Sequence, residues 1–586
     1  MSDKPSNQDR DRRVLDLFDR VLEIEQRLIP TGLHVFGRAS TKTEIVDMLC
    51  MVASFDRPER GIRALPDLVA SGLGLADYST LVKESATSDM SLAHREQVEK
   101  AVRDSVRCYV AGGKDGAEQA SRLLLDRASV PVEESMKVFA LLGEIQSELR
   151  RSSEIEGLLR ALRGEYIEPG PGADIVQNPS ILPTGRNTHA INPNSVPSVS
   201  AMRRAEPLAR ALVDRFKSES GRYPESVAMV LWGIDNIKTE GESVAQALWL
   251  LGVMPRRDSL NRATDVEVIP LERLGRPRID VVMTVSGIFR DLFGVTMSLL
   301  DRAVRSVASL DEPEELNYVK RHARRQVEET GCSFDEAVVR VFSNAAGNYG
   351  TNVNFMVLDS QWEQSGELGD LFITRKCFAY GKDSRGNSFD GMESRRLLER
   401  ALARVEASYQ SLDSAEVGLT DVDHYFEYLG GVSRAVEEQS GARPRIFVAD
   451  SLAPGAKVRT LEETLRLETR TKVLNPKWYE GMLAHGFSGV AEIEHQVSNT
   501  FGWSATADAV DDWIYDEVAQ TYVLDQKMLE RLRTLNPHSA RTLVGRLLEA
   551  AGRGFWSADQ SVIDRLQDAF NELEDELEGV GQLKHV

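Results

Sequence analysis

The chain has 586 residues, of which 42% are hydrophobic and 28% are charged, and its formal net charge is −20. This length exceeds what one hydrophobic core supports and indicates about three to four domains. Nucleic acid is disfavoured as a partner, because its phosphates bind to positively charged surfaces. Four cysteines in so long a chain make no disulfide framework and form no CxxC metal motif, which favours a reducing, cytoplasmic location.

Three further properties are disfavoured because their signals are missing. The N-terminal string MSDKPSNQDRDRR is polar and has no apolar core of an export signal. The best apolar run, VAMVLWGI, has eight residues and is far shorter than a membrane span. A P-loop requires GxxxxGK[ST], and the nearest string, AGGKDG, lacks the first glycine and the Ser/Thr. We therefore expect no export signal, no membrane span and no ATP site in this chain.

The first part of the chain is predicted to be helical. Hydrophobic periodicity indicates helices through residues 41–160, and we assign residues 1–160 to a helical region. Residues 164–201 then carry six prolines and four glycines, a density that excludes regular helix and sheet. Apolar side chains such as Tyr166 and Ile181 recur among its turns. We therefore expect residues 161–215 to form an ordered connecting segment, not a featureless linker.

Residues 216–455 are predicted to form an α/β core. The strings SVAMVLWG and RIDVVMTVSG are typical of buried strands, whereas ESVAQALWLLG and FGVTMSLLDRAVRSVASL have helical periodicity. This alternation predicts a mainly parallel sheet with helices on both sides. ARPRIFVADS indicates another strand, and AVVRVFSNAAGNYG is interpreted as the end of a helix followed by a loop. From residue 456 the pattern is helical again, so the fold class is α/β, flanked by helical N-terminal and C-terminal regions.

The loop GIDNIKTEGES, which follows the first predicted strand, is rich in charged side chains. In parallel sheets the loops after the strands carry ligands. Its carboxylates could accept protons or hold a hard cation. Thr239 and Glu242 have the spacing of a capping box, which explains Glu242 without any catalytic role. Asp235 and Glu240 are less easily explained by capping, and Lys238 lies between them.

Two further loops after predicted elements carry candidate binding residues. SGIFRDLFG places Arg290 and Asp291 among apolar residues, where the pair is either structural or provides an anchor for a carboxylate ligand. SNAAGNYGTNVN contains Asn344 and two glycines. Turn chemistry explains most of that pattern, although such a loop also allows close backbone approach.

The string TDVDHYFEYLGG has the densest group of candidate catalytic and ligand-binding residues in the chain. His424 lies between Asp421 and Asp423 on one side and Tyr425 and Phe426 on the other. A carboxylate beside a histidine can fix its tautomer and raise its basicity. A metal site, a site for a flat aromatic ligand and a satisfied core histidine all remain compatible with this string.

Long strings of the chain resemble one family and occur in the same order in it. The chain is similar to the CobN/magnesium-chelatase family, the large subunits of magnesium chelatase and aerobic cobaltochelatase. DNIKTEGES, NTFGWSATA and ELEDELEGV favour the magnesium side, whose large subunit binds the porphyrin, whereas Arg186 and YVLD fit the cobalt enzymes equally. The strings that carry the resemblance include RLIPTGLHVFG, GEYIEPGPGADIVQNPSILPTGRNTHAINP, LWGIDNIKTEGESVAQALWLLG, RVFSNAAGNYGTNVN, DVDHYFEYLGG, VRTLEETLRLETRTKVLNPKWYEGML and FGWSATADAVDDWIYDE.

The resemblance implies insertion of Mg²⁺ into protoporphyrin IX in (bacterio)chlorophyll biosynthesis. Mg²⁺ is then a substrate, and ATP is hydrolysed by partner AAA+ ATPase subunits, small and middle, and is not bound here. Because only the C-terminal half of the family is matched, a separate N-terminal-half polypeptide is a further expected partner. The alternatives are insertion of Co²⁺ into a corrin ring and a non-catalytic porphyrin-binding or docking module.

The resemblance also suggests roles for the candidate residues. His424 is expected to act as base or metal-delivery ligand, with Asp421 or Asp423 orienting it. Glu240 is a second catalytic carboxylate, and Glu240 and Asp235 are expected metal ligands together with His424. The expected substrate-binding residues are Arg290, Lys238, Arg186, Asn344 and His189.

Overall fold

The computed structural model divides into two compact units: among the described residues, one contains residues within 34–190, and the other contains residues 32–33 and those from 191 onward. Each unit is described by itself. Among the described residues, no helix is both long and apolar enough to cross a membrane. The residues described are 17, 21, 24, 32–57, 60–85, 88–150, 153–172, 175–176, 178–186, 191–382, 386, 389–414, 416–451 and 457–579.

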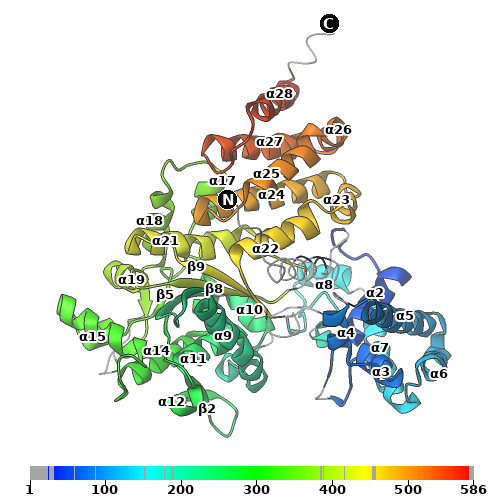
Figure 1. The fold of residues 1–586 in the computed structure, drawn as a ribbon, viewed down its shortest axis with the longest axis horizontal. Coiled ribbons are helices and arrows are strands. Elements are labelled where there is room, and N and C mark those ends of the chain that lie inside the picture. The colour runs from blue at the N-terminus through cyan, green and yellow to red at the C-terminus, as the bar shows by residue number, and fades with distance from the viewer. Residues whose placement is uncertain are drawn as a thin grey trace, which may run out of the picture. The chain divides into compact units, whose positions relative to one another are not determined.

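The first unit is helical (Figure 1). Several of its helices bury an apolar stripe, as in α5, where Val98, Val102 and Val106 recur every four residues and are all buried. Side-chain caps fix several helix starts, among them Thr41, which forms a capping box with Glu44 at the start of α2. The helices are α2 (Lys42–Ala53), α3 (Leu65–Gly72), α4 (Tyr78–Glu84), α5 (Asp89–Ala111), α6 (Gly116–Ala128), α7 (Val132–Leu149) and α8 (Glu154–Leu162).

The second unit is built on an eight-stranded sheet with the order β10-β9-β8-β1-β4-β5-β6-β7. The five central strands pair in parallel, and β10, β6 and β7 pair antiparallel at the two edges. The prediction of a mainly parallel sheet is confirmed. The strands are β1 (Ser226–Leu231), β4 (Asp280–Val285), β5 (Val341–Ser343), β6 (Phe378–Tyr380), β7 (Met392–Glu393), β8 (Ala407–Leu412), β9 (Arg445–Asp450) and β10 (Lys457–Thr460).

Helices cover both faces of this sheet, as its alternating side chains require. Val227 and Met229 of β1 join one hydrophobic core, whereas Ala228 and Val230 join the other. The first core includes α9 (Val199–Ser220), α11 (Glu242–Leu251), α14 (Gly294–Ala308) and α15 (Tyr318–Thr330). The second includes α17 (Val353–Leu358), α18 (Ser365–Lys376), α19 (Arg395–Leu402) and α21 (Gly431–Ser440). Short helices in the loops are α10 (Gly233–Lys238), α12 (Leu271–Leu274), α13 (Gly287–Leu292), α16 (Phe334–Ala337) and α20 (Asp423–Tyr425).

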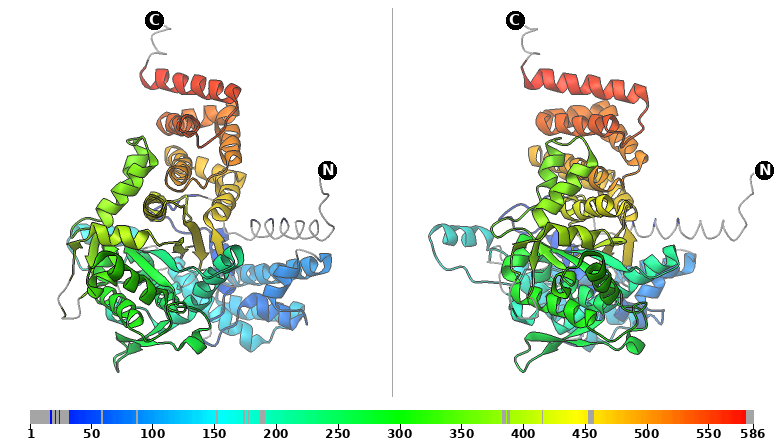
Figure 2. Two further views of the ribbon diagram at one scale, coloured as in Figure 1. Left: turned by 60° about the vertical axis from the view of Figure 1, so that its left-hand side comes forward. Right: turned by 90° about the vertical axis from the view of Figure 1, so that its left-hand side faces the viewer.

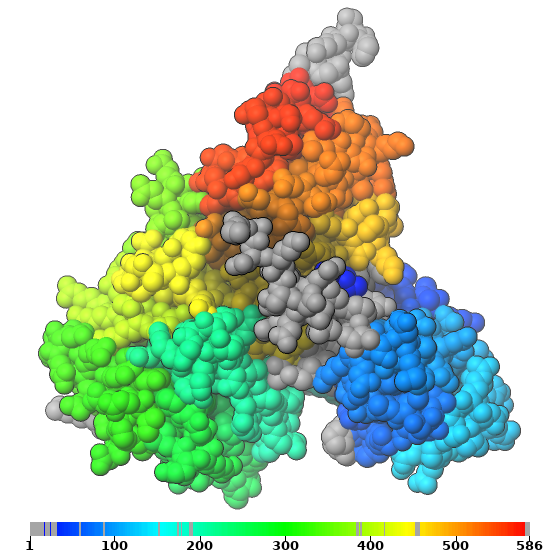
Figure 3. Space-filling model, viewed as in Figure 1, coloured from blue at the N-terminus to red at the C-terminus, as the bar shows by residue number. Residues whose placement is uncertain are grey.

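The C-terminal helices share the second of these cores with the sheet and stack away from it in layers (Figure 2). In the space-filling view their yellow, orange and red surfaces continue the green surface of the α/β part (Figure 3). Gly502 of α24 allows the ring of Phe426 to pack against the helix, because a Cβ there would lie 2.6 Å from that ring. The helices are α22 (Leu461–Glu468), α23 (Pro476–Leu483), α24 (Phe487–Ala507), α25 (Asp512–Ala519), α26 (Gln526–Leu535), α27 (Pro537–Gly552) and α28 (Gln560–Leu577).

Several strand features differ from the sequence-based expectation, and β6, β7 and β10 were not predicted. AVVRVFSNAAGNYG was interpreted as the end of a helix and a loop, but Val341–Ser343 is a strand, too short for a periodicity signal. Strand β8 was not predicted, because polar residues interrupt the apolar ones in its sequence ASYQSL. Two of these polar residues, Ser408 and Gln410, are nevertheless buried. The hairpin of β2 (Val253–Arg257) and β3 (Ala263–Val268) was also missed, since it lies outside the main sheet and is only partly buried.

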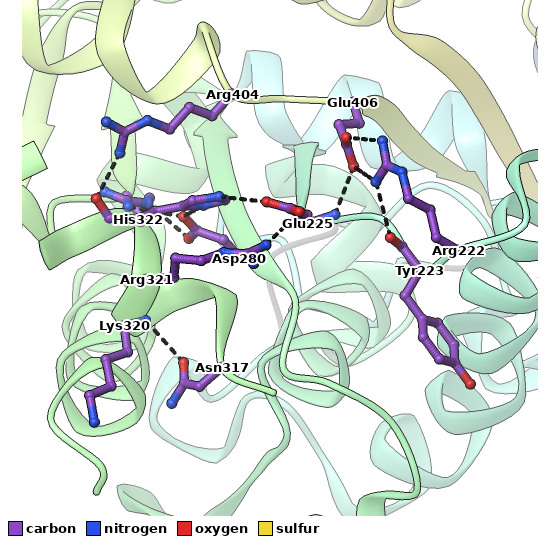
Figure 4. A network of polar contacts seen from close by, with 11 residues as sticks. Arg222, Tyr223, Glu225, Asp280, Asn317, Lys320, Arg321, His322, Arg404 and Glu406 are labelled. Carbon is purple, nitrogen blue, oxygen red and sulfur yellow. Dashed lines mark hydrogen bonds and ion pairs between the residues drawn. The ribbon is translucent and has the colours of Figure 1, made fainter. Parts of the chain in front are cut away.

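A buried ion network lies at the amino ends of the central strands (Figure 4). His322 of α15 contacts Asp280 Oδ2 through Nδ1 at 2.9 Å and Glu225 Oε2 through Nε2 at 3.3 Å. Arg340 donates to both carboxylate oxygens of Asp280, at 2.8 and 2.9 Å. Because both ring nitrogens of His322 face acceptors, the imidazole is favoured in its doubly protonated form. The network ties α15 to β1 and β4.

Candidate functional site

The loops at the carboxyl ends of the parallel strands form the candidate site. From β1 the chain adds β4 and β5 on one side and then β8 and β9 on the other, so the strand order reverses between β1 and β8. Such a switch point is where parallel α/β sheets place ligands. Gly233, after β1, donates its N–H to Ser286 Oγ, after β4, at 3.0 Å. The first two loops are therefore joined directly.

His424 lies at this edge, in the short helix α20. Its Nδ1 donates to Glu427 Oε2 at 2.6 Å, and its side chain is 53% exposed. Glu427 belongs to a π-helical turn, Phe426–Gly430, and is fully buried. Its other oxygen, Oε1, accepts from Thr351 Oγ1 at 2.9 Å and from the N–H groups of Thr351 and Asn352. The carboxylate is thus fixed from behind and fixes the imidazole in turn.

This arrangement sets the chemistry of His424. The hydrogen bond to Glu427 raises the pKa of His424, aided by the charges of Glu427 and Asp423 and opposed by partial burial. Since Nδ1 holds its proton toward Glu427, the neutral ring presents its lone pair at Nε2. Nε2 makes no hydrogen bond to any described residue. Within the described part of the chain, the ring is thus held through Nδ1 and leaves Nε2 without a partner.

The two aspartates near His424 have different contacts. Asp423 Oδ2 accepts from Asn354 Nδ2 at 2.6 Å, and Asp423 Oδ1 is 3.8 Å from His424 Nδ1. Asp421 instead binds Lys472 Nζ and Gln496 Nε2, and accepts from the N–H of Gly418. The carboxylate that orients His424 is Glu427. In place of the expected orienting role, the contacts of Asp421 tie its loop to the C-terminal helices.

Arg290 and Asn344 shape the loop that holds Glu427. Arg290 Nη1 donates to the carbonyls of Ala345 at 2.6 Å and Asn348 at 2.9 Å, and its Nε donates to Asp291. Asn344 is fully buried and donates to the carbonyl of Gly350 at 2.7 Å. These donors are committed to the protein itself. The contacts support a loop-shaping role for both residues, where substrate binding had been expected.

Lys376 is a buried cation beside this loop. Its Nζ donates to Asn344 Oδ1 at 2.9 Å and to the carbonyl of Val285 at 2.8 Å, and it lies 4.0 Å from the ring centroid of Tyr428. Burial lowers the pKa of Lys376 well below its usual value, although Glu427 opposes the shift. The lysine stiffens the loop from the side of the sheet.

A small cavity at the switch point gathers three carboxyl groups, from Asp235, Glu242 and Asp413. Burial, with the charge of Asp413, raises the pKa of Asp235 to about 8. Lys238 Nζ lies 3.5 Å from Asp413 Oδ2, so Lys238 balances this cluster. Glu242 Oε2 accepts from Arg204 Nε at 2.8 Å. The raised pKa favours the protonated form of Asp235, which is a poorer ligand for Mg²⁺ than a carboxylate.

Trp232 connects the cavity with the turn that carries His424. It lines the cavity, and its ring centroid lies 4.4 Å from that of Tyr428 and 5.9 Å from that of Tyr425. Both tyrosines flank Glu427 in sequence. The carboxyl cluster and the histidine are therefore two neighbouring parts of one edge, separated by aromatic rings.

The remaining candidates lie elsewhere. Glu240 is exposed, and its Oε2 accepts from Ser200 Oγ at 3.1 Å. Arg186 belongs to the first unit, where its guanidinium donates to the carbonyls of Ser180, Ile181 and Leu182 and so folds the proline-rich segment. His189 lies outside the described residues. Within the described ranges no three His, Cys, Asp or Glu side chains converge as a metal site, so His424, Glu240 and Asp235 are not brought together as ligands.

Three functional candidates were missed by sequence reasoning. Glu427 follows His424 by three residues, one helical turn, and this spacing could have identified it. Asp413 follows β8, which had not been predicted. No sequence pattern could have identified Lys376 as a buried residue, because a lysine at a helix end is ordinarily solvated.

Comparison with known proteins places this geometry in context. The family model described as CobN/Magnesium Chelatase matches residues 1–563. The chain is 42% identical to the chloroplastic magnesium-chelatase protein ChlH of Oryza sativa subsp. indica, covering 98% of this chain and 43% of that protein. It is 39% identical to the corresponding magnesium-chelatase protein of Chlorobaculum parvum, covering 97% and 45%.

A solved structure shows the same fold. The catalytic subunit of cobaltochelatase from Mycobacterium tuberculosis superposes with a TM-score of 0.88 at 32% identity, covering 98% of this chain and 47% of that one. The chain thus spans less than half the length of these relatives. From the match along nearly its whole length, the chain belongs to the CobN/magnesium chelatase family.

Proposed function

We propose that the chain is the C-terminal half of a magnesium chelatase large subunit, which binds protoporphyrin IX and takes part in inserting Mg²⁺ into it. Greater identity to the magnesium-chelatase proteins than to the cobaltochelatase structure supports magnesium as the metal. The observation that carries a catalytic role is the His424–Glu427 pair, a half-exposed base backed by a buried carboxylate at the ligand-binding edge of the sheet.

The chemistry requires proton removal. Two pyrrole N–H protons leave the macrocycle as the metal enters, and Mg²⁺ gives up tightly held water. In this proposal Nε2 of neutral His424 accepts one pyrrole proton, Glu427 stabilises the imidazolium that forms, and solvent water takes the second proton. Asp423, beside His424, adds negative charge that favours both the imidazolium and the approaching cation.

Partners complete the reaction in this proposal. ATP is hydrolysed by the small and middle AAA+ subunits, and an N-terminal-half polypeptide contributes the rest of the porphyrin cavity. Two other functions are the measurable alternatives. The first alternative is insertion of Co²⁺, and the observation behind it is the likeness to the cobaltochelatase catalytic subunit. Porphyrin binding without insertion would make this half a docking module.

The decisive experiment compares His424→Ala with a control, His495→Ala. This control replaces an exposed histidine on α24. Each variant is titrated with protoporphyrin IX and assayed for insertion of Mg²⁺ and Co²⁺ in parallel, with all partner subunits supplied. We expect His424→Ala to keep its melting temperature and porphyrin affinity and to lose about 10²- to 10⁴-fold in Mg²⁺ insertion. His495→Ala should behave as wild type.

Other outcomes assign other functions. Normal insertion by His424→Ala would exclude His424 as the base. A loss of stability in step with activity would make it a structural histidine. Faster insertion of Co²⁺ than of Mg²⁺ by the wild type would favour the cobalt function, and porphyrin binding without insertion of either metal would favour the docking module.

A further inference from the structure

Tyr349 is an exposed aromatic ring that is held unusually firmly. Tyr349 is 53% exposed, yet its hydroxyl donates to Asp291 Oδ2 at 2.8 Å. The guanidinium of Arg290 lies 5.4 Å from its ring centroid, and the hydroxyl of Tyr428 donates to its carbonyl. Its hydroxyl, one ring face and backbone are therefore all fixed, while much of the ring remains open.

Core packing does not explain this arrangement. A half-exposed ring gains little from burial, and its hydroxyl bonds to Asp291, whose side chain is itself 41% exposed, so this hydrogen bond adds little to stability. Gly287 allows the ring to approach, because a Cβ there would lie 2.7 Å from Tyr349 Cδ1. The protein thus orders an aromatic surface in advance of any contact, which lowers the entropic cost of binding a flat ligand.

The surroundings of the ring are also apolar and exposed. Ile288, next to Gly287, is 39% exposed, and Phe355, in helix α17 after the loop that carries Tyr349, is 59% exposed. The loop connects this surface to the proposed base, since Thr351 and Asn352 hold the carboxylate of Glu427. A ligand that covers Tyr349 therefore lies on the segment that positions His424.

We propose that the open face of Tyr349 is the platform on which one face of the tetrapyrrole stacks, flanked by Ile288 and Phe355. This inference rests on the proposed function and adds to it the surface that receives the macrocycle. Planar π-systems stack on aromatic rings in offset geometry, and the guanidinium of Arg290 behind the phenol adds a cation–π contact to the stack. Asp291 and Arg290 hold the ring, and Tyr349 makes the contact.

The test uses three variants of the full chain, titrated with protoporphyrin IX by fluorescence. Tyr349→Leu removes the aromatic surface, Tyr349→Phe keeps it but loses the bond to Asp291, and Phe334→Leu is the matched control. Phe334 is 40% exposed and lies in α16, which precedes the amino end of β5, whereas Tyr349 follows the carboxyl end of the same strand. All three should retain the wild-type melting temperature.

We expect Tyr349→Leu to raise the Kd for protoporphyrin by about 2- to 10-fold, from the usual worth of an aromatic pair. Tyr349→Phe should fall between it and the wild type, and Phe334→Leu should bind normally. Insertion is measured over a range of porphyrin concentrations, so that a loss of porphyrin binding is separated from a loss at the His424–Glu427 pair.

The outcomes separate this inference from the proposed function. Normal porphyrin affinity in Tyr349→Leu, with insertion still lost in His424→Ala, would overturn the platform and leave the function in place. A wild-type chain that binds no protoporphyrin would overturn both. If Tyr349→Leu bound porphyrin normally but lost stimulation by the ATPase subunits, the surface would belong to a protein partner, and the platform would be wrong.

Discussion

At the scale of single residues, the site depends on a carboxylate that is more strongly held than the base it supports. Glu427 is buried and accepts three hydrogen bonds at Oε1, whereas His424 makes its hydrogen bond through Nδ1 alone. A carboxylate restrained in this way cannot follow the imidazole if the ring moves. It therefore selects one tautomer and one orientation, and it keeps the pKa of His424 above its usual value.

This pair predicts a pH dependence. His424 acts as a base only when neutral, so the rate of insertion should rise with pH through its raised pKa, with a midpoint above the usual value of about 6.5. Glu427→Gln removes the negative charge, which should lower that pKa and move the midpoint to lower pH. Above both midpoints the rate should still be lower by about 10- to 100-fold, because the ring is less well oriented.

The measurement is the pH–rate profile of insertion at saturating porphyrin and metal. Glu517→Gln, an exposed glutamate of α25, is the control and should leave the profile unchanged. An unshifted midpoint in Glu427→Gln would show that the titrating base is another group.

At the scale of elements, the sequence predicted the parts that obey simple periodicity. The apolar runs SVAMVL and DVVMTV became β1 and β4, buried on both faces. The position of His424 after the α/β alternation was also predictable in outline. The three-residue spacing of Glu427 after His424 also pointed to this partner, but the π-helical turn in which Glu427 lies is set by packing against α24, not by the local pattern. Contacts made by Arg290 and Asn344 were likewise decided by tertiary structure.

Packing between α24 and this turn leads to a second prediction. Gly502→Ala places a Cβ 2.6 Å from the ring of Phe426, so the turn or the helix must shift. We expect a loss of about 1–3 kcal/mol in the free energy of unfolding, together with reduced insertion, because Glu427 follows Phe426 directly. Gly552→Ala in α27 is the control, since nothing lies within 4 Å of its added Cβ.

Urea unfolding and the insertion assay check this prediction together. Wild-type stability and activity in Gly502→Ala would mean that the π-helical turn does not depend on this contact. A helix-stabilising effect in Gly552→Ala is expected, because alanine exceeds glycine in helix propensity.

At the scale of the whole second unit, the carboxyl ends and the amino ends of the parallel strands carry different kinds of side chain. The carboxyl ends carry the half-exposed side chains of His424 and Tyr349, and the amino ends carry the closed network of His322, Asp280, Glu225 and Arg340. Burial opposes charge on His322, but its hydrogen bonds to Asp280 and Glu225 raise its pKa. The pKa of Asp280 is lowered to about 2 by Arg340 and His322, against its burial, and that of Glu225 to about 2 chiefly by His322. Other charged groups around the network are Arg321, Arg222, Glu406, Arg404 and Glu329.

These shifts predict how stability changes with pH. A raised histidine pKa stabilises the fold fully below about pH 6.5 and loses that stabilisation as pH rises through the folded value. The lowered carboxyl pKa values stabilise the fold above about pH 4 and lose their effect as pH falls toward 2. In urea unfolding followed by tryptophan fluorescence, His322→Gln should be less stable than wild type at pH 6. The difference should shrink toward pH 9, whereas a constant difference would contradict a charged His322.

The single core shared by the sheet and the C-terminal helices determines where a chain of this family can be divided. Residues of β1, β4 and β9 pack in the same cluster as those of α22, α24 and α27. A break between residues 451 and 457 would leave two apolar surfaces without cover and would remove the helix against which Phe426 packs. Gene fission, fusion to reporters or exchange of segments between magnesium and cobalt members therefore has to keep residues 191–579 as one block. The chain passes between the two compact units near residue 190, which is the better point of exchange, although Leu33 also packs against the core of the second unit.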